Sequence, residues 1–322
     1  MAILAGIDEA GLGPRLGPLV VGLAVFRGPR GVLDRLADAL APEVRADGRA
    51  PVPVGDSKRL YAAARGLHVL ERGIYPFVRL ATGVLPRSLA EWLGRLELAR
   101  PDTPPFAAPL PWYAAPLELP RAVSPDRLEE GADRLGAALA RAGVEASEVR
   151  TVVVAEDEVN RALARCGSKN VLNFEAAAPL LRRMFEVAAG DADEDMEIVV
   201  DRQGGRKDYA ALLGRLFHPA VVHCRPAPEG VSAYTVRTAA RHAEIRFATR
   251  ADAAFLPVSL ASMLAKYTRE LHMTLLNRFW QARLPDLKPT AGYPTDAGRF
   301  LDRIDACRRA AGIPVDRLVR NR

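Results

Sequence analysis

Short apolar runs, separated by polar turns, recur along the 322-residue chain and alternate with longer amphipathic stretches. The first run, residues 2–7, predicts a buried strand, and residues 19–26 predict a second strand close enough to pair with it as a hairpin. The same reading predicts further strands at 72–84, 151–155, 197–200, 220–224 and 243–247, and helices at 32–40, 61–71, 125–142, 173–189, 256–280 and 296–311. This alternation is typical of the α/β class.

Residues 99–125 interrupt the alternation with eight prolines, and Trp112 and Tyr113 lie among them. Such composition predicts an insertion or a long surface loop. The two aromatic residues are expected to pin this segment to the body of the protein, with base stacking as the alternative. We therefore expect a single domain over residues 1–322, with an insertion at about 85–150.

Composition restricts the class of protein. Hydrophobic residues make up 49% of the chain and charged residues 26%, as in a soluble globular protein. No apolar run approaches the roughly 20 residues of a membrane span, and Asp8 interrupts the N-terminal apolar run too early for a signal peptide. The three cysteines are far apart, which argues against a disulfide framework and favours the cytoplasm.

Charge adds a hint about partners. The formal net charge is +6, which is compatible with nucleic-acid binding, although an arginine-rich composition alone produces such a balance. The chain has only five lysines, and where arginine is the default cation a retained lysine suggests a need for its compact ammonium. Three of them, Lys58, Lys169 and Lys266, stand in small-residue contexts and are candidate functional cations.

The candidate chemistry begins where the first strand ends. Asp8 and Glu9 follow the apolar run directly, and a loop containing Gly11, Gly13 and Pro14 comes next. On these two acids alone an ordinary solvated turn is the simpler interpretation. Two later acids change it: Asp201 ends the strand at 197–200, and Asp252 precedes the long helix at 256–280. Acids at strand ends can converge at one edge of a sheet, and because like charges raise one another's pKa values, such a cluster needs cations. Two divalent ions, Mg²⁺ or Mn²⁺, would relieve the repulsion and activate water for phosphodiester hydrolysis.

Other chemistries fit poorly. The spacing of Gly11, Gly13 and Gly17 is wrong for a dinucleotide-binding fingerprint, and no phosphate-binding P-loop occurs. The five histidines have no metal-ligand spacing, and no nucleophile elbow supports serine hydrolysis.

Five stretches, in the right order, resemble the ribonuclease HII (type 2 ribonuclease H) family. They are GIDEAGLGPRLGPLVVG, GDSKRL, IVVDRQ, ADAAFLPVSLASMLAKYTRE and AGYPTDAG. Each is weak alone, but five collinear matches are specific, and they frame nearly the whole chain except residues 72–156. The resemblance implies a ribonuclease H-like fold, a central mixed sheet flanked by helices with a helical C-terminal part.

The resemblance also implies an activity. It is metal-dependent endonucleolytic cleavage of RNA in RNA–DNA hybrids and at ribonucleotides embedded in duplex DNA, by a monomeric protein, leaving a 3′-OH and a 5′-phosphate. The implied metal carboxylates are Asp8, Glu9, Asp201 and Asp252. The implied substrate contacts are the loop Gly11, Leu12 and Gly13, the phosphate-holding Ser57 and Lys58, the nearby Lys266 and Arg269, and Tyr293, which would stack on the ribose and sense its 2′-OH.

Three departures from the family pattern stand out. Leu12 replaces an arginine, Arg202 replaces a small residue after the third acid, and Glu270 replaces an aspartate. Simpler roles stay open for several residues: Lys58 as a cap, Tyr293 as part of a turn, Ser262 as a small residue for helix packing and Glu270 as a solvated charge. A catalytically weak nucleic-acid-binding protein of the same fold is the main alternative function, and a DNA-junction nuclease is a third.

Overall fold

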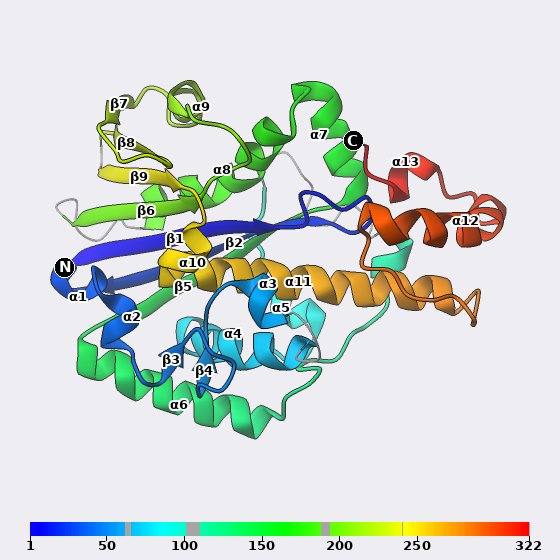
Figure 1. Cartoon of the computed structure of the whole chain (residues 1–322), viewed down its shortest axis with the longest axis horizontal. Coiled ribbons are helices and arrows are strands. Elements are labelled where there is room, and N and C mark those ends of the chain that lie inside the picture. The colour runs from blue at the N-terminus through cyan, green and yellow to red at the C-terminus, as the bar shows by residue number, and fades with distance from the viewer. Residues whose placement is uncertain (62–65, 101–109, 188–193, 240, 322) are drawn as a thin grey trace.

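A seven-stranded mixed sheet forms the centre of the protein in the computed structural model, which describes residues 1–61, 66–100, 110–187, 194–239 and 241–321 (Figure 1). In spatial order its strands are β5 (Glu145–Val154), β2 (Leu19–Gly28), β1 (Ala2–Ala10), β6 (Asp195–Asp201), β9 (His242–Ala248), β8 (Val231–Arg237) and β7 (Val221–Arg225). A separate pair joins β3 (Val44–Arg45) to β4 (Val52–Pro53).

The strand directions decide where the functional edge lies. β1 pairs antiparallel with β2, as the predicted hairpin requires, and β2 pairs antiparallel with β5. β6 lies parallel to β1 on its other side, β9 lies parallel to β6, and β8 and β7 continue as an antiparallel meander. The carboxyl ends of β1, β5, β6 and β9 therefore all lie at one edge of the sheet.

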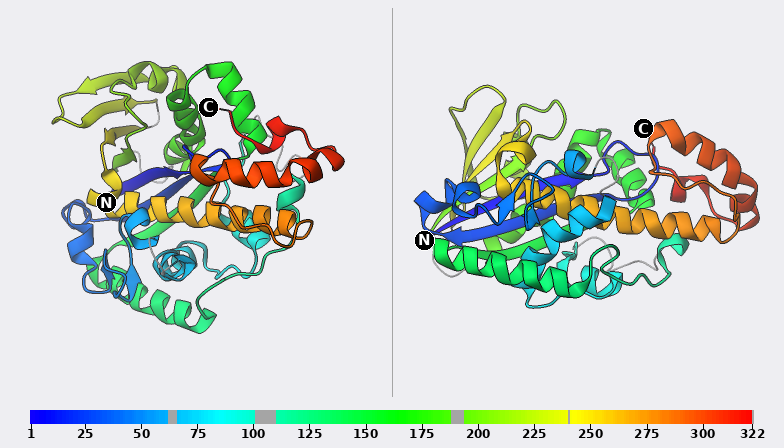
Figure 2. Two further views of the ribbon diagram at one scale, coloured as in Figure 1. Left: turned by 45° about the vertical axis from the view of Figure 1, so that its right-hand side comes forward. Right: turned by 60° about the horizontal axis from the view of Figure 1, so that its bottom comes forward.

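Helices cover both faces of the sheet, which gives three layers (Figures 1 and 2). One face carries α11 (Leu256–Gln281), α4 (Gly66–Thr82), α5 (Leu89–Leu96) and α6 (Pro125–Ala142), and the other carries α7 (Glu156–Cys166), α8 (Lys169–Val187) and α9 (Ala210–Leu216). Each side has its own apolar core, and α12 (Pro294–Ala310) and α13 (Val315–Leu318) form a helical C-terminal part. The remaining short elements are α1 (Arg30–Leu33), α2 (Leu36–Ala39), α3 (Ser57–Tyr61), η1 (Pro111–Tyr113) and α10 (Ala251–Ala254).

The predicted α/β class is confirmed. None of the helices described is long and apolar enough to cross a membrane.

Two glycines allow α11 to lie unusually close to the sheet. A Cβ added at Gly6 on β1 would come within 2.2 Å of the backbone of Pro257, and one at Gly22 on β2 within 2.2 Å of the carbonyl oxygen of Ala261. Gly22 is also the strand partner of Asp8. This close approach brings the polar face of α11 against the end of β1 that carries the acids.

The strand predicted at 72–84 is wrong, because this segment continues α4. Its β-branched and aromatic residues favour a strand, yet Val69, Ile74, Phe77 and Val78 recur at helical spacing and are buried against the sheet. Tertiary packing of this amphipathic face decides the structure, even with Pro76 inside the helix. The helix predicted at 61–71 falls partly on residues 62–65, which lie outside the described residues. Among the longer elements, α5, α7, α9 and β8 are absent from the sequence-based prediction, and so are the short elements β3, β4, α3, η1, α10 and α13.

The proline-rich segment is attached to the body as predicted. Trp112 is buried and packs on Phe279, while the Tyr113 ring packs edge-on against His272. These contacts confirm the pinning role and leave Trp112 unavailable for base stacking. Residues 101–109 of the segment lie outside the described residues. Within the predicted insertion at 85–150, the last residues belong to β5 of the central sheet, and the boundaries of the insertion stay a prediction.

Candidate active site

Parallel pairing places two of the predicted acids side by side. Ile7 of β1 pairs with Val200 of β6, so Asp8 and Asp201 are the next residues of neighbouring strands at the same edge. The Asp201 carboxylate accepts a 2.7 Å hydrogen bond from the backbone N–H of Ala251, the first residue of α10. That bond ties α10, whose second residue is Asp252, to the end of β6.

Alternation along the strands assigns the acids to different faces. On β6, Asp201 lies two residues after Val199 and so points to the same face, which packs on the α11 side. On β1, Asp8 also faces α11, where it is hydrogen-bonded to Ser262. Glu9 lies two residues after Ile7 and so points to the same face of the sheet, which packs in the core on the α8 side. The structure thus brings Asp8 and Asp201 together on the side where α10 begins, and turns Glu9 toward the opposite side of the sheet.

Acidic side chains gather at this edge of the sheet. Burial raises the pKa of Asp8 well above its usual range, and the charges of Glu9 and Asp201 raise it further. Hydrogen bonds from Ser262 and from the backbone N–H of Glu9, the latter at 2.7 Å, oppose that rise only partly. Clustered carboxylate oxygens of this kind are the donors that Mg²⁺ and Mn²⁺ prefer. Within the described residues, however, no group of three or more Asp, Glu, His or Cys side chains is positioned to hold a metal ion.

The Asp-Ser-Lys segment reaches the acids through α11. The Ser57 hydroxyl is buried and lies 3.0 Å from the Ser262 hydroxyl, which is in turn hydrogen-bonded to Asp8. Ser262 is therefore more than a small packing residue. Lys58 lies in α3, but its side chain is outside the described part of the chain, so its predicted phosphate contact stays a prediction.

The glycine loop and the Tyr293 loop form one unit beside the acids. The backbone N–H groups of Arg15 and Leu16 both donate to the Gly292 carbonyl, at 2.8 and 3.2 Å. Gly13 is exposed, and Tyr293 begins α12 with 43% of its surface exposed. The two segments predicted to meet the ribonucleotide are therefore adjacent and accessible.

Lys266 and Arg269, in contrast, are occupied by the protein itself. The Lys266 ammonium lies 2.8 Å from Glu270 and 4.5 Å from the centre of the Tyr61 ring. Arg269 is 1% exposed and donates to the carbonyls of Leu16 and Ala291 at 3.1 and 3.0 Å. Because these two carbonyls belong to the two loops, Arg269 joins them, which suits a positioning role better than the direct contact inferred from the sequence.

The three residues that differ from the family pattern contact other parts of the protein. Glu270, for which the sequence leaves the choice between ligand and solvated charge open, is largely buried and also accepts a hydrogen bond from Tyr61 at 3.0 Å. Arg202 donates to the Arg206 carbonyl at 2.8 Å and to the Thr249 hydroxyl at 3.2 Å. The Leu12 side chain packs against the apolar core on the α8 side. None of these side chains occupies the position between the acids.

Two buried charges beneath the glycine loop are missed by sequence reasoning. Glu156, the first residue of α7, accepts from the Gly17 N–H at 3.2 Å and from the Tyr113 hydroxyl at 2.8 Å. Burial raises its pKa to about 7, and the opposing charge of Arg320 only partly offsets the rise. Arg320 donates to the carbonyls of Gly11, Leu12 and Gly17. No sequence motif identifies Glu156 and Arg320, because most of their partners are backbone groups far away in the sequence.

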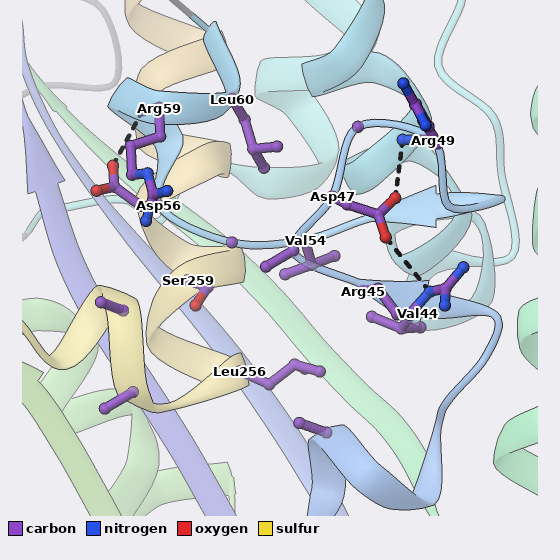
Figure 3. Close-up of a pocket in the computed structure, with 16 residues that line it drawn as sticks. Val44, Arg45, Asp47, Arg49, Val54, Asp56, Arg59, Leu60, Leu256 and Ser259 are labelled. Atoms are coloured by element: carbon purple, nitrogen blue, oxygen red, sulfur yellow. Dashed lines mark hydrogen bonds and ion pairs between the residues drawn. The ribbon is translucent and has the colours of Figure 1, made fainter.

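An arginine-rimmed cavity of about 820 Å³ lies beside α10 and the start of α11 (Figure 3). It separates the β3–β4 segment from α10 and the start of α11, and its rim carries Arg45, Arg49 and Arg59 together with Asp47 and Asp56. On one side the cavity is bounded by the two alanines that follow Asp252, and on the other by the residues that precede Ser57. It therefore lies beside α10, the short helix that contains Asp252.

Comparison with known proteins supports the nuclease interpretation. The family model described as Ribonuclease HII matches residues 219–301, the segment that runs from before β7 into α12 and includes Asp252, Lys266, Arg269 and Tyr293. No curated protein sequence matches the chain significantly.

Solved structures of three ribonucleases align with almost the whole chain. Ribonuclease HII of Archaeoglobus fulgidus, solved as a complex with PCNA, is 18% identical with a TM-score of 0.42, covering 99% of this chain and 94% of that one. Ribonuclease H2 of Pyrococcus horikoshii OT3 is 18% identical with a TM-score of 0.44, covering 99% and 92%. Bst-RNase HIII in complex with Mn²⁺ is 15% identical with a TM-score of 0.44, covering 99% and 66%.

The mixed sheet has helices on both faces and carboxylates at the ends of β1 and β6. The family-model match over residues 219–301 confirms the resemblance to the ribonuclease HII family over that segment.

Proposed function

We propose that the protein is a metal-dependent endonuclease that hydrolyses RNA in RNA–DNA hybrids and at single ribonucleotides embedded in duplex DNA. Water would attack the phosphorus on the 5′ side of a ribonucleotide, the bond to the preceding 3′-oxygen would break, and a 3′-OH and a 5′-phosphate would result. One observation carries the proposal: Asp8 and Asp201 adjoin at one edge of the sheet, where burial, together with the charges of Glu9 and Asp201, raises the pKa of Asp8 well above its usual range.

The residues available for Mg²⁺ or Mn²⁺ are Asp8, Glu9, Asp201 and Asp252. Bound there, divalent ions would supply charge neutralisation and an activated water. The chain itself contributes the placement of the carboxylates: the N–H of Ala251 holds Asp201, and Ser262 holds Asp8.

Recognition of the ribonucleotide is proposed for the glycine loop and Tyr293. The 2′-OH is the group that distinguishes RNA from DNA, and an exposed aromatic ring at the mouth of the site can stack on the sugar that bears it. The ring is steadied by the Arg269 guanidinium, whose central carbon lies 5.7 Å from the ring centre.

We assign the flanking phosphates to the cavity rim. Arg45, Arg49 and Arg59 outnumber the two rim aspartates, and Asp47 is already engaged by Arg45 at 3.5 Å and by the N–H of Arg49 at 2.9 Å. A net positive rim next to the acids suits the sugar–phosphate backbone, which binds chiefly through charge. A positive rim of this kind is consistent with a double-helical substrate. We further propose that the protein acts as a monomer in the cytoplasm.

A cleavage assay tests the proposal directly. Duplex DNA with one embedded ribonucleotide, an RNA–DNA hybrid and all-DNA duplex are incubated with Mg²⁺ and then with Mn²⁺, and product ends are analysed. The proposal expects cleavage of the first two only, with 3′-OH and 5′-phosphate ends. Binding of all three substrates without cleavage would favour the weak-binding alternative, which the orientation of Glu9 away from Asp8 keeps open.

A further inference from the structure

Arg320 occupies the centre of the space beneath the glycine loop. Its side chain comes from the segment after α13 and is 4% exposed. The guanidinium donates to the carbonyls of Gly11 and Leu12, the latter at 3.0 Å, and to that of Gly17 at 3.4 Å. Its own backbone N–H donates to the Arg15 carbonyl at 2.8 Å. A planar fork of donors suits such a set of carbonyls, and a lysine ammonium would satisfy it only in part.

A second residue, Asn160, holds the segment after α13 in place by hydrogen bonds. This segment, residues 319–321, is called the strap below. The Asn160 side-chain amide, on α7, donates to the carbonyls of Asp316 and Val319 at 2.7 and 2.8 Å and accepts from the Asn321 N–H at 2.6 Å. Glu156 lies one helical turn earlier on α7 and holds the Gly17 N–H. The same helix therefore fixes both the strap that carries Arg320 and one end of the loop that Arg320 supports (Figures 1 and 2).

The contacts of Arg320 determine which way two peptide groups face. In a trans peptide the N–H points away from the C=O of the same unit. With the carbonyls of Gly11 and Leu12 drawn inward to the guanidinium, the N–H groups of Leu12 and Gly13 face outward. Gly11 has a φ of +94°, so the peptide that follows it can rotate at little cost unless it is held.

We infer that Arg320 is a positioning residue for the reaction, which holds the N–H groups of Leu12 and Gly13 as outward donors to an oxygen of the bound ribonucleotide. The inference rests on the proposed function for the identity of the ligand, and on the contacts above for the position of the loop. The inference also bears on Leu12, which replaces the family's arginine in the loop. Leu12 brings no cation to the loop, but the Arg320 guanidinium contacts the loop from the protein interior.

The test compares Arg320→Met, Arg320→Lys and the control Arg241→Met in the full-length chain. Arg241 is similarly buried, at 6% exposed, but precedes β9 at the opposite end of the sheet. Amide hydrogen exchange of the peptide covering residues 9–18 reports the loop without any need for activity. We expect exchange about tenfold faster in Arg320→Met, an intermediate value in Arg320→Lys and no change in Arg241→Met.

Kinetics on duplex DNA with one embedded ribonucleotide give the second readout. Arg320→Met should lower kcat about tenfold or more with KM nearly unchanged, and Arg320→Lys should recover part of the loss. If Arg320→Met does not fold, Asn160→Ala releases the strap without altering Arg320 and should loosen the same peptide. Unchanged exchange in every variant that folds would overturn the inference. A wild-type protein that cleaves none of the substrates would instead refute the proposed function, while hydrogen exchange would still decide the role of Arg320.

Discussion

Titratable groups are buried at two places around the glycine loop, and the two places differ in the sign of the charges that surround them. At the strand ends, Asp8 lies next to Glu9 and Asp201, and burial together with these neighbouring charges raises its pKa well above the usual range. Beneath the loop, Glu156 and Arg320 oppose one another, and the guanidinium is surrounded by carbonyl oxygens. The neighbouring charges that act on Asp8 are both negative, whereas a carboxyl and a guanidinium of opposite sign face each other beneath the loop. We call the first place the unbalanced edge and the second the balanced region, and we expect only the first to attract a cation.

The largest effect is expected from Asp201→Asn at the unbalanced edge. Asparagine still accepts the hydrogen bond from the Ala251 N–H, so the fold should persist, but the negative charge is lost. Cleavage of an RNA–DNA hybrid should fall roughly a thousandfold or more, because metal-ion charge stabilisation contributes several kcal/mol. Hybrid affinity, measured without cleavage by fluorescence anisotropy, should change little, since phosphate contacts dominate binding.

Asp195→Asn is the matched control, because Asp195 is an exposed acid at the other end of the same strand. Equal loss of cleavage in both variants would show that removing any acid from β6 is harmful, and would break the distinction between the two regions.

Tyr293→Ala tests the accessible side of the loop. Stacking on an aromatic ring contributes about 1–3 kcal/mol, so cleavage at a single embedded ribonucleotide should fall roughly ten- to a hundredfold. Long hybrids should suffer less because they offer many registers, and Tyr293→Phe should retain most of the activity. If both substrates are cleaved by Tyr293→Ala as well as by the wild type, the tyrosine is only part of a turn.

Glu156→Gln sharpens the comparison through pH. The usual pKa of 4.5 rises to about 7 in the folded state because of burial, partly opposed by the Tyr113 hydroxyl, the Gly17 N–H and Arg320. Since the folded state binds this proton more tightly than the unfolded state, its contribution to stability is fully present below about pH 4.5 and is lost as the pH rises through 7. The glutamine variant should therefore be more stable than the wild type at pH 8, by about 1–3 kcal/mol, and similar to it near pH 4.5. Thermal unfolding of both proteins across this range measures the difference, and a constant difference at every pH would show that Glu156 does not titrate there.

The smallest effect is expected at the cavity rim. Replacing both Arg45 and Arg49 by alanine should lower the salt dependence of duplex binding by about two units of slope, one for each phosphate that the rim no longer neutralises. The control pair, Arg127 and Arg134, is exposed on α6 and does not line the cavity, and its replacement should leave the slope unchanged. Equal slopes for the wild type and both variants would remove the cavity from the binding surface.

The difference between the two regions also explains what could be predicted from the sequence. Asp8 and Asp201 follow apolar runs, and the hydrophobic pattern locates the ends of buried strands well, so their meeting at one edge could be foreseen. Arg320 and Glu156 bind backbone groups, which carry no side-chain signature, and the carbonyl partner of Arg320 at Gly11 lies 309 positions earlier.

The wrong strand prediction and the untested role of Arg269 both depend on packing that a sequence does not display. The second half of α4 has the local propensity of a strand, and only tertiary packing makes its helical pattern decisive. The motif around Arg269 points to the substrate, since a sequence cannot show that this guanidinium is enclosed by the carbonyls of two distant loops. Motifs therefore identify which residues matter, whereas packing determines whether each one faces the ligand or the protein.

Direct titration of Mn²⁺ by isothermal calorimetry tests the central distinction without any substrate. The account predicts binding to the wild-type protein, loss of binding in Asp8→Asn and Asp201→Asn, and binding retained in Glu156→Gln, whose acid belongs to the balanced region. Absence of Mn²⁺ binding by the wild type, or equal loss in Glu156→Gln, would contradict it.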